Sequence, residues 1–157
     1  MRPEDYMKKA IDAARRGSRR GQTPFGACIV MGSEVVSTAH NEVWLRNDIT
    51  AHAEIRAIQK ACKELGTIDL SGCEIYSTCE PCPMCFSACH WARISKIVFG
   101  ASIEDAQKAG FRELTISNDE MKSLGKDDDI EVKGGFMREE NVKLFELWAS
   151  QKGKKTY

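Results

Sequence analysis

Four of the chain's seven cysteines stand within eleven residues, in the stretch CEPCPMCFSAC from Cys79 to Cys89. Their spacing, C-x2-C-x2-C-x3-C, is one in which bacterial proteins hold an iron–sulfur cluster, although His90 follows here where that run continues with proline. The same thiols could instead bind zinc, or they could bind nothing. The choice among these three decides what chemistry the protein performs.

A histidine and a glutamate upstream favour zinc. His52 and Glu54 stand at the start of an expected helix. Cys82 and Cys85 open the next expected helix, where a spacing of three lets both sulfurs face one point. His52, Cys82 and Cys85 would give zinc three protein ligands, which leaves a fourth position open for water, as in catalytic sites. H-x-E followed by P-C-x-x-C is also the pattern of zinc deaminases, in which the glutamate moves protons and does not bind the metal. An iron–sulfur cluster would leave His52 and Glu54 without a role.

The bulk composition predicts one soluble domain, residues 1–157. Lysine plus arginine equals aspartate plus glutamate at 23 each, so no overall field attracts nucleic acid or an anionic membrane. No segment approaches the roughly 20 apolar residues of a membrane span, and the N-terminal residues lack the apolar run of a secretory signal. An odd cysteine count without such a signal predicts reduced thiols and a cytoplasmic protein.

Hydrophobic periodicity predicts the elements that carry these residues. Helices are expected over 3 to about 16, 53–65, 83–93 and 139–150. Strands are expected over 25–30, 34–39, 73–77, 97–99, 114–116 and 131–133, the first two as an antiparallel hairpin. Strands that alternate with helices after an opening hairpin indicate an α/β protein with a mixed sheet.

At the zinc motifs the chain resembles the cytidine-deaminase-like superfamily, and within it the bacterial-type guanine deaminases most closely. The likeness covers nearly the whole chain, and the following stretches carry it: Pro24-Phe-Gly-Ala27, Asn41, Thr50-Ala-His-Ala-Glu54, Cys79-Glu-Pro-Cys-Pro-Met-Cys85, Trp91-Ala-Arg93, Ala109-Gly-Phe111 and Lys154-Lys-Thr-Tyr157. This resemblance implies a three-layer α/β/α fold with a five-stranded mixed sheet. It also implies Zn²⁺ as cofactor and hydrolytic deamination of a free aminopurine, guanine to xanthine and ammonia.

The resemblance also implies roles for individual residues. Glu54 would be the catalytic proton shuttle, and His52, Cys82 and Cys85 the zinc ligands. The expected substrate contacts are Asn41, Phe25, Ala53, Trp91, Glu113 and Tyr157. A homodimer is implied, in which the C-terminal helix and tail, about 139–157, cross to the partner and close its site. From the residues alone, Asn41 could be a turn residue that ends the hairpin strand, Phe25 and Trp91 could be core, and Tyr157 could be a frayed terminus.

Two points leave the substrate open. Guanine deaminases of this type carry Asp-Asp after Ala-Gly-Phe, whereas this chain has Arg112-Glu113, so a related aminopurine, a nucleoside or an aminated triazine remains an alternative. The tRNA adenosine deaminases share the zinc motifs, the asparagine and the Phe-Gly-Ala segment, but they tend to be basic. A non-catalytic zinc-stabilised binding protein is a further alternative, and Glu54 speaks against it because a structural zinc site needs no adjacent carboxylate.

Overall fold

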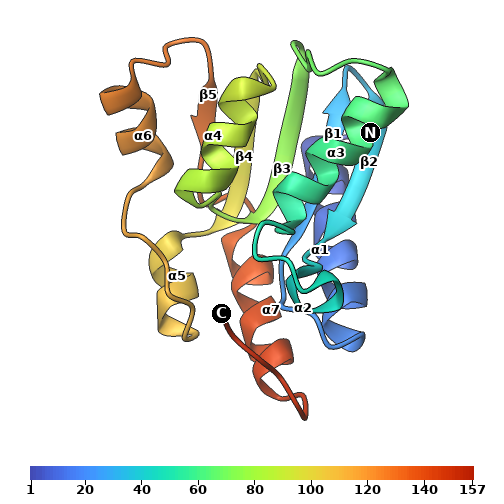
Figure 1. Ribbon diagram of the computed structural model, residues 1–157, viewed down its shortest axis with the longest axis vertical. Coiled ribbons are helices and arrows are strands. Elements are labelled where there is room, and N and C mark those ends of the chain that lie inside the picture. Colours follow the sequence, from blue (N-terminus) through green and yellow to red (C-terminus); the bar gives the residue numbers. More distant parts are fainter.

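The structure is a computed structural model that describes all residues from 1 to 157. The elements in chain order are α1 (Pro3–Arg19), β1 (Gly26–Met31), β2 (Glu34–His40), α2 (Val43–Arg46), α3 (Ala53–Leu65), β3 (Cys73–Cys79), α4 (Pro83–Trp91), β4 (Lys96–Ala101), α5 (Ile103–Lys108), α6 (Asn118–Gly125), β5 (Glu131–Lys133) and α7 (Arg138–Ala149). Figure 1 shows these elements along the chain.

One five-stranded sheet of order β2-β1-β3-β4-β5 organises the molecule. β1 pairs antiparallel with β2 and with β3, whereas β3 pairs parallel with β4 and β4 with β5. Parallel neighbours need a crossover, and the helices α4 and α6 provide it. The predicted mixed five-stranded sheet of an α/β protein is therefore confirmed.

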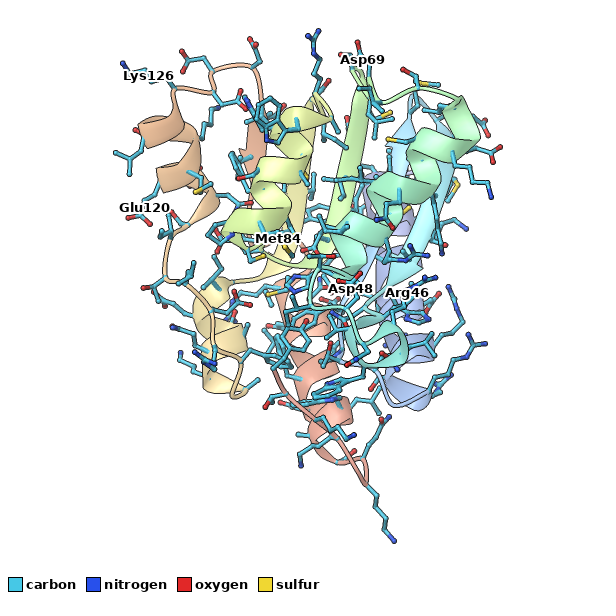
Figure 2. All side chains as sticks on the ribbon, viewed as in Figure 1. Arg46, Asp48, Asp69, Met84, Glu120 and Lys126 are labelled. Carbon is cyan, nitrogen blue, oxygen red and sulfur yellow. The ribbon has the colours of Figure 1, made fainter.

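Helices cover both faces of the sheet, which makes three layers (Figure 1). Along β1, Ala27 and Ile29 pack on the side of α3 and α4, whereas Cys28 and Val30 pack on the side of α1 and α7. Successive side chains of a strand point to opposite faces, so a strand buried on both faces reads as a continuous apolar run. Charged side chains such as Asp69, Glu120 and Lys126 lie on the outside (Figure 2). None of the helices has the length and apolarity that crossing a bilayer requires.

Helix α1 approaches the sheet closely at one glycine. A Cβ atom on Gly26 would lie 2.0 Å from the carbonyl oxygen of Ala10, so only glycine fits between α1 and the start of β1. The contact fixes the Pro24-Phe-Gly-Ala27 stretch, and with it Phe25, against the helix layer.

Two predictions about the C-terminal half need correction, and two short helices there were not predicted. Residues 114–116 were expected to form a strand, but the chain is irregular from 111 to 117, and β5 occupies the edge beside β4 instead. The short helices α5 and α6 follow Ser102 and Ser117, whose side chains cap them, and periodicity did not predict them because they are shorter than the usual amphipathic window. The helix expected over 83–93 ends earlier, at Trp91, and Arg93 lies outside it with a left-handed φ of 59°.

Candidate metal centre and active site

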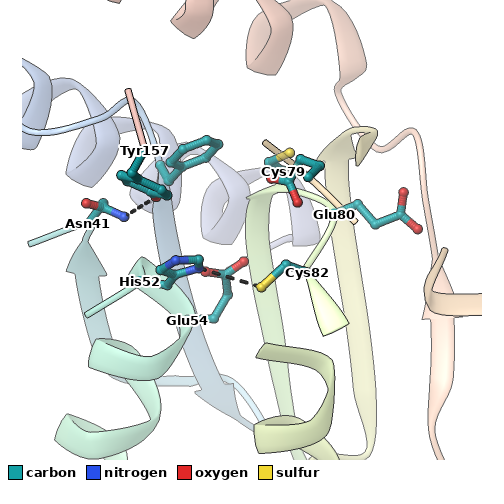
Figure 3. Close-up of a pocket in the computed structure, with 9 residues that line it drawn as sticks. Asn41, His52, Glu54, Cys79, Glu80, Cys82 and Tyr157 are labelled. Carbon is teal, nitrogen blue, oxygen red and sulfur yellow. Dashed lines mark hydrogen bonds between the residues drawn. The ribbon is translucent and has the colours of Figure 1, made fainter. Parts of the chain in front are cut away.

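Two helix starts bring the expected metal ligands together. His52 is the N-cap residue of α3 and Cys82 that of α4, both with extended backbone. Pro83 occupies the first position of α4, where its fixed φ suits the helix and its missing N–H costs nothing. Cys85 follows in the first turn of α4, three residues after Cys82, so that both sulfurs lie on the same face of the helix. Figure 3 shows His52 and Cys82 facing each other across the gap between the helices.

The distances between the donor atoms fit zinc. His52 Nδ1 lies 3.7 Å from Cys82 Sγ and 3.5 Å from Cys85 Sγ. A tetrahedral zinc with ordinary Zn–S and Zn–N bonds separates sulfur from nitrogen by about 3.6 Å. All donor atoms of this group lie within 4.8 Å of one another, and no other His, Cys, Asp or Glu group converges in this way. The chemistry and spacing of the donor set therefore match a three-ligand zinc centre.

The remaining two cysteines of the run take no part in this cluster. Cys89 is fully buried in the core between α4 and the sheet. The thiol of Cys79 donates to the backbone oxygen of Ser102 at 3.5 Å. Four thiolates are needed for the usual iron–sulfur cluster, and only two of the four face the centre, so the geometry excludes that interpretation.

The thiols and the imidazole influence one another electrostatically. The hydrogen bond with Cys85 lowers the pKa of Cys82 to about 4, and the same interaction raises the pKa of Cys85. Burial lowers the pKa of His52, but the hydrogen bond with Cys82 and the charge of Glu54 outweigh it, so the net pKa is raised. Because a metal ligand must be deprotonated, binding zinc releases protons from this group.

Glu54 lies beside the ligands without being one of them. It is the second residue of α3, and only 6% of it is exposed. Its carboxylate accepts from Ser77 Oγ at 3.2 Å and from Cys85 Sγ at 3.6 Å. Burial raises the pKa of Glu54, which brings the carboxyl group toward the range in which it can both take up and release a proton near neutral pH.

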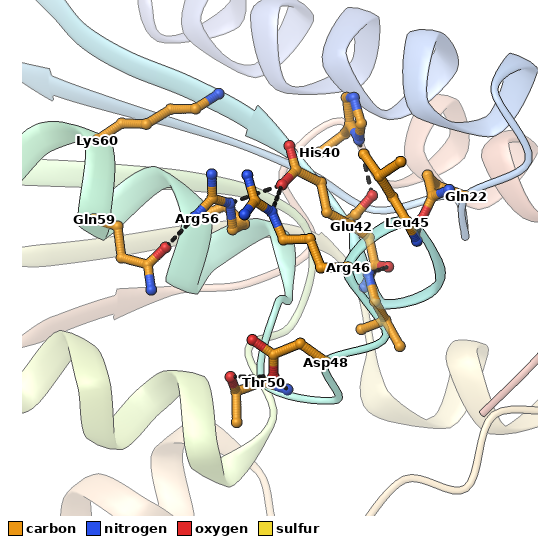
Figure 4. A network of polar contacts seen from close by, with 12 residues as sticks. Gln22, His40, Glu42, Leu45, Arg46, Asp48, Thr50, Arg56, Gln59 and Lys60 are labelled. Carbon is orange, nitrogen blue, oxygen red and sulfur yellow. Dashed lines mark hydrogen bonds and ion pairs between the residues drawn. The ribbon is translucent and has the colours of Figure 1, made fainter.

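The connection between β2 and α3 holds Asn41 at one end and His52 at the other. The backbone N–H of Glu42 donates to Ala51 O at 2.9 Å and so joins the two ends of this connection. The Glu42 carboxylate pairs with Arg46 and, at 2.9 Å, with Arg56 of α3 (Figure 4). This network fixes Asn41 relative to the metal ligand.

A cavity opens in front of the metal centre. Nine residues line it: Phe25, Asn41, His52, Glu54, Cys79, Glu80, Cys82, Glu113 and Tyr157. The side-chain oxygen of Asn41 accepts from the Val43 N–H at 3.0 Å, and its amide nitrogen donates to Tyr157 Oη at 2.6 Å. Burial raises the pKa of Glu113 to about 7. The cavity thus presents one amide donor, the carboxyl groups of Glu54 and Glu113, and the rings of Phe25 and Tyr157.

The structure brings most of the expected site residues together, but not Ala53 and Trp91. Ala53 is fully buried in the core between α3 and the sheet and does not line the cavity. Trp91 stands at the far end of α4 from Cys85 and is 79% exposed. There its ring contacts His90 and lines a separate surface cavity that includes Asp127. Within one chain, therefore, neither side chain reaches the metal centre.

Sequence reasoning left the role of Cys79 open, and it missed Glu80 and one contact. Cys79 and Glu80 line the cavity, and the signal for them was their place at the end of a strand, three and two residues before Cys82. Thr23 Oγ1 lies 3.5 Å from Tyr157 Oη. No local pattern could indicate that contact, since the two residues are 134 positions apart.

Comparison with known proteins agrees with this geometry. The family model of the cytidine and deoxycytidylate deaminase zinc-binding region matches residues 1–101. The chain belongs to this family, and it is a zinc-dependent deaminase.

The relatives of this chain include two kinds of deaminase. The chain is 45% identical over 112 residues to a guanine deaminase of Bacillus subtilis, covering 71% of this chain and 72% of that protein. It is 46% identical over 101 residues to a tRNA-specific adenosine deaminase of Aquifex aeolicus, covering 64% and 67%.

The solved structures that resemble this chain are of the same two kinds, guanine deaminases and a tRNA deaminase. A guanine deaminase from Nitrosomonas europaea superposes with a TM-score of 0.86 at 27% identity, covering 96% of this chain and 86% of that one. The guanine deaminase structure from Bacillus subtilis gives 0.70 at 36% identity, covering 100% and 99%. A tRNA:A34 deaminase gives 0.78 at 31% identity, covering 90% and 99%.

Proposed function

We propose that the protein hydrolyses guanine to xanthine and ammonia. The observation that carries the proposal is the buried Glu54 carboxylate beside three convergent zinc ligands, at the inner wall of a cavity that also holds Asn41 and Glu113. The likeness to two guanine deaminases supports guanine as the substrate.

Each residue of the site has a defined task in this reaction. His52, Cys82 and Cys85 would hold a zinc ion, which would supply a water activated for attack at neutral pH. Glu54 takes one proton from the attacking water and gives it to the ring nitrogen beside C2, as the water oxygen bonds to C2 and the double bond between C2 and that nitrogen becomes single. Glu54 then takes the proton of the new C2 hydroxyl and gives it to the amine, so that the C2–amine bond breaks, ammonia leaves and the C2 carbonyl of xanthine forms. Ser77 Oγ lies 3.2 Å from one Glu54 oxygen and 2.7 Å from Cys79 O, so its hydroxyl contacts both the carboxylate and the end of β3.

The cavity wall complements a free purine base. The Val43 N–H occupies the Asn41 side-chain oxygen, so the amide nitrogen faces the cavity and presents a donor. Guanine offers O6 and N7 as acceptors. The Glu113 carboxylate can in turn accept from a ring N–H. The cavity encloses about 20 Å³, room for about one water molecule, so a base can enter only when Tyr157, which contacts Asn41 there, moves aside.

Deamination of adenosine in tRNA is the second candidate, because tRNA-specific deaminases are about as similar to this chain as the guanine deaminase. The net charge of zero speaks against it, because phosphate contacts require a basic face. Tyr157 covers the cavity against either substrate and does not separate the two candidates.

A homodimer in the cytoplasm, with residues 139–157 exchanged between subunits, is the assembly we propose. In this single chain the tail closes its own site. The Bacillus structure matches the whole chain at higher identity, yet superposes less well than the Nitrosomonas one. A C-terminal segment placed differently in the two chains would produce that contrast. Mixing a tail-deleted chain with a Glu54→Gln chain tests the exchange, because activity returns only if the tail acts on the partner.

The function is tested by ammonia release from guanine, guanosine, adenine, an aminated triazine and a tRNA anticodon stem–loop, with zinc measured in each sample. Guanine should give the highest kcat/KM, with little dependence on salt. A preference for the stem–loop whose rate falls steeply with salt would support the tRNA activity instead. Absence of ammonia from every substrate by fully zinc-loaded protein would refute both candidates.

A further inference from the structure

Glu80 stands directly before the metal-ligand segment, but its carboxylate does not face the metal. It follows the last residue of β3, and its backbone N–H donates to Ala101 O of β4 at 2.8 Å. Only 8% of the residue is exposed. In Figure 3 its carboxylate points away from His52 and Glu54. No step of the reaction described above uses it.

The carboxylate instead joins the starts of two helices. One oxygen accepts from the N–H of Ile103, the first residue of α5, at 3.2 Å. The other accepts from the N–H of Asn118, the first residue of α6, at 2.9 Å. N–H groups in the first turn have no partner within their helix, and a negative charge is favourable there. The Asn118 side chain returns a hydrogen bond to Pro81 O at 2.6 Å.

The segment between these helices contributes one wall of the cavity. Residues 109–117 pair with no strand, and they carry Phe111 and Glu113. Phe111 packs against Phe25 and Tyr157, with ring centroids 4.9 and 5.5 Å apart. Glu80 binds the start of α6, which directly follows this segment, and the start of α5, the helix that precedes it. Its carboxylate therefore helps to fix how far Glu113 lies from the metal ligands.

We propose that Glu80 is a positioning residue for substrate binding, which ties the helices flanking segment 109–117 to the chain segment that bears Cys82. The inference rests on the proposed function, since it takes Glu113 as a substrate contact. A carboxylate suits this task because it has two acceptor oxygens on one rigid group. Glutamine has a single acceptor oxygen, and its NH₂ would face a donor. Aspartate keeps the charge but is one methylene shorter, so it cannot span both N–H groups.

The test compares Glu80→Gln and Glu80→Asp with wild type. Glu104→Gln is the matched control, because it removes an exposed carboxylate from the first turn of α5 without touching either N–H group. Asn118→Ala removes the hydrogen bond from the Asn118 side chain to Pro81 O and leaves the Glu80 carboxylate in place. For each protein we would measure zinc content, kcat and KM for guanine, and hydrogen exchange over 103–118.

Both Glu80 variants should keep zinc, raise KM about tenfold or more with a smaller change in kcat, and exchange faster over 103–118. Asn118→Ala should change in the same direction, and Glu104→Gln should match wild type. A KM within about twofold of wild type with unchanged exchange would overturn the proposal. So would rescue by Glu80→Asp, which would assign Glu80 a purely electrostatic role, or zinc loss in both Glu80→Gln and Asn118→Ala. If wild type releases no ammonia from guanine, the proposed function fails, and hydrogen exchange alone decides whether Glu80 holds the segment.

Discussion

The side-chain amide of Asn41 donates a hydrogen bond to the phenol oxygen of Tyr157 across 2.6 Å, although the two residues lie 116 positions apart. The last residue of the chain thus occupies the donor that we assign to the substrate. The backbone N–H of Arg112 holds Tyr157 O at 3.4 Å, and the tyrosine ring lies 5.4 Å from the His52 ring. Substrate entry therefore requires Tyr157 to move, and its return would exclude water from the bound base.

Deletion of residues 155–157 should lower kcat/KM for guanine about tenfold or more, because the cavity loses the wall that closes it. Zinc content should stay at the wild-type level, since the tail provides no ligand. Lys152→Ala is the control, because Lys152 is exposed. A truncated enzyme with wild-type kcat/KM would remove the tail from the mechanism.

Asn41→Ala should raise KM for guanine by about 10- to 100-fold, because the ring loses its donor and the Val43 N–H loses its acceptor. Steady-state kinetics at equal zinc loading would measure it. Asn41→Asp is the informative companion, since a carboxylate can still accept from Val43 but presents no donor to the cavity. If Asn41→Asp binds guanine as wild type does, the donor has no role in recognition.

The metal site was predictable from sequence for a local reason. His52 and Cys82 are N-cap residues, and their helices begin at the positions that the apolar pattern and Pro83 predict. The mixed sheet with its opening hairpin was also predictable, because hairpin and crossover signals are local, whereas the order of the strands was not predicted. Segment 111–117 was not, since its path depends on hydrogen bonds to Glu80, which is distant in sequence. The position of Trp91 could not be read from its motif either, because the motif does not say which end of α4 faces the metal.

Cys85→Ala should lose zinc and activity together, because the loss of one ligand of three weakens binding by at least about 100-fold. It should also lower Tm, as ligand binding to the native state stabilises it. Atomic absorption and calorimetry would measure both. Cys89→Ala is the control that separates zinc from an iron–sulfur cluster, because Cys89 completes the four-cysteine run but lies in the core. If both variants lose the metal equally, the ligand set is wrong.

Gly26→Ala should destabilise the fold by about 1–3 kcal/mol or more, because its Cβ would overlap the Ala10 carbonyl oxygen and push α1 from the sheet. Urea unfolding of both proteins would give the difference. Gly125→Ala is the matched control, since a Cβ there meets no atom within 4 Å. Equal stability of Gly26→Ala and wild type would mean that α1 does not pack on β1 in this way.

The most direct test of the whole account is the turnover of guanine by zinc-loaded Glu54→Gln protein. The amide has nearly the same shape as the carboxylate but cannot accept and return a proton, so zinc should bind fully while kcat falls by about 10²–10⁴-fold. Xanthine and ammonia formation, measured against wild type at equal zinc content, decides the matter. A kcat within about tenfold of wild type would contradict the assignment of Glu54 as the proton carrier.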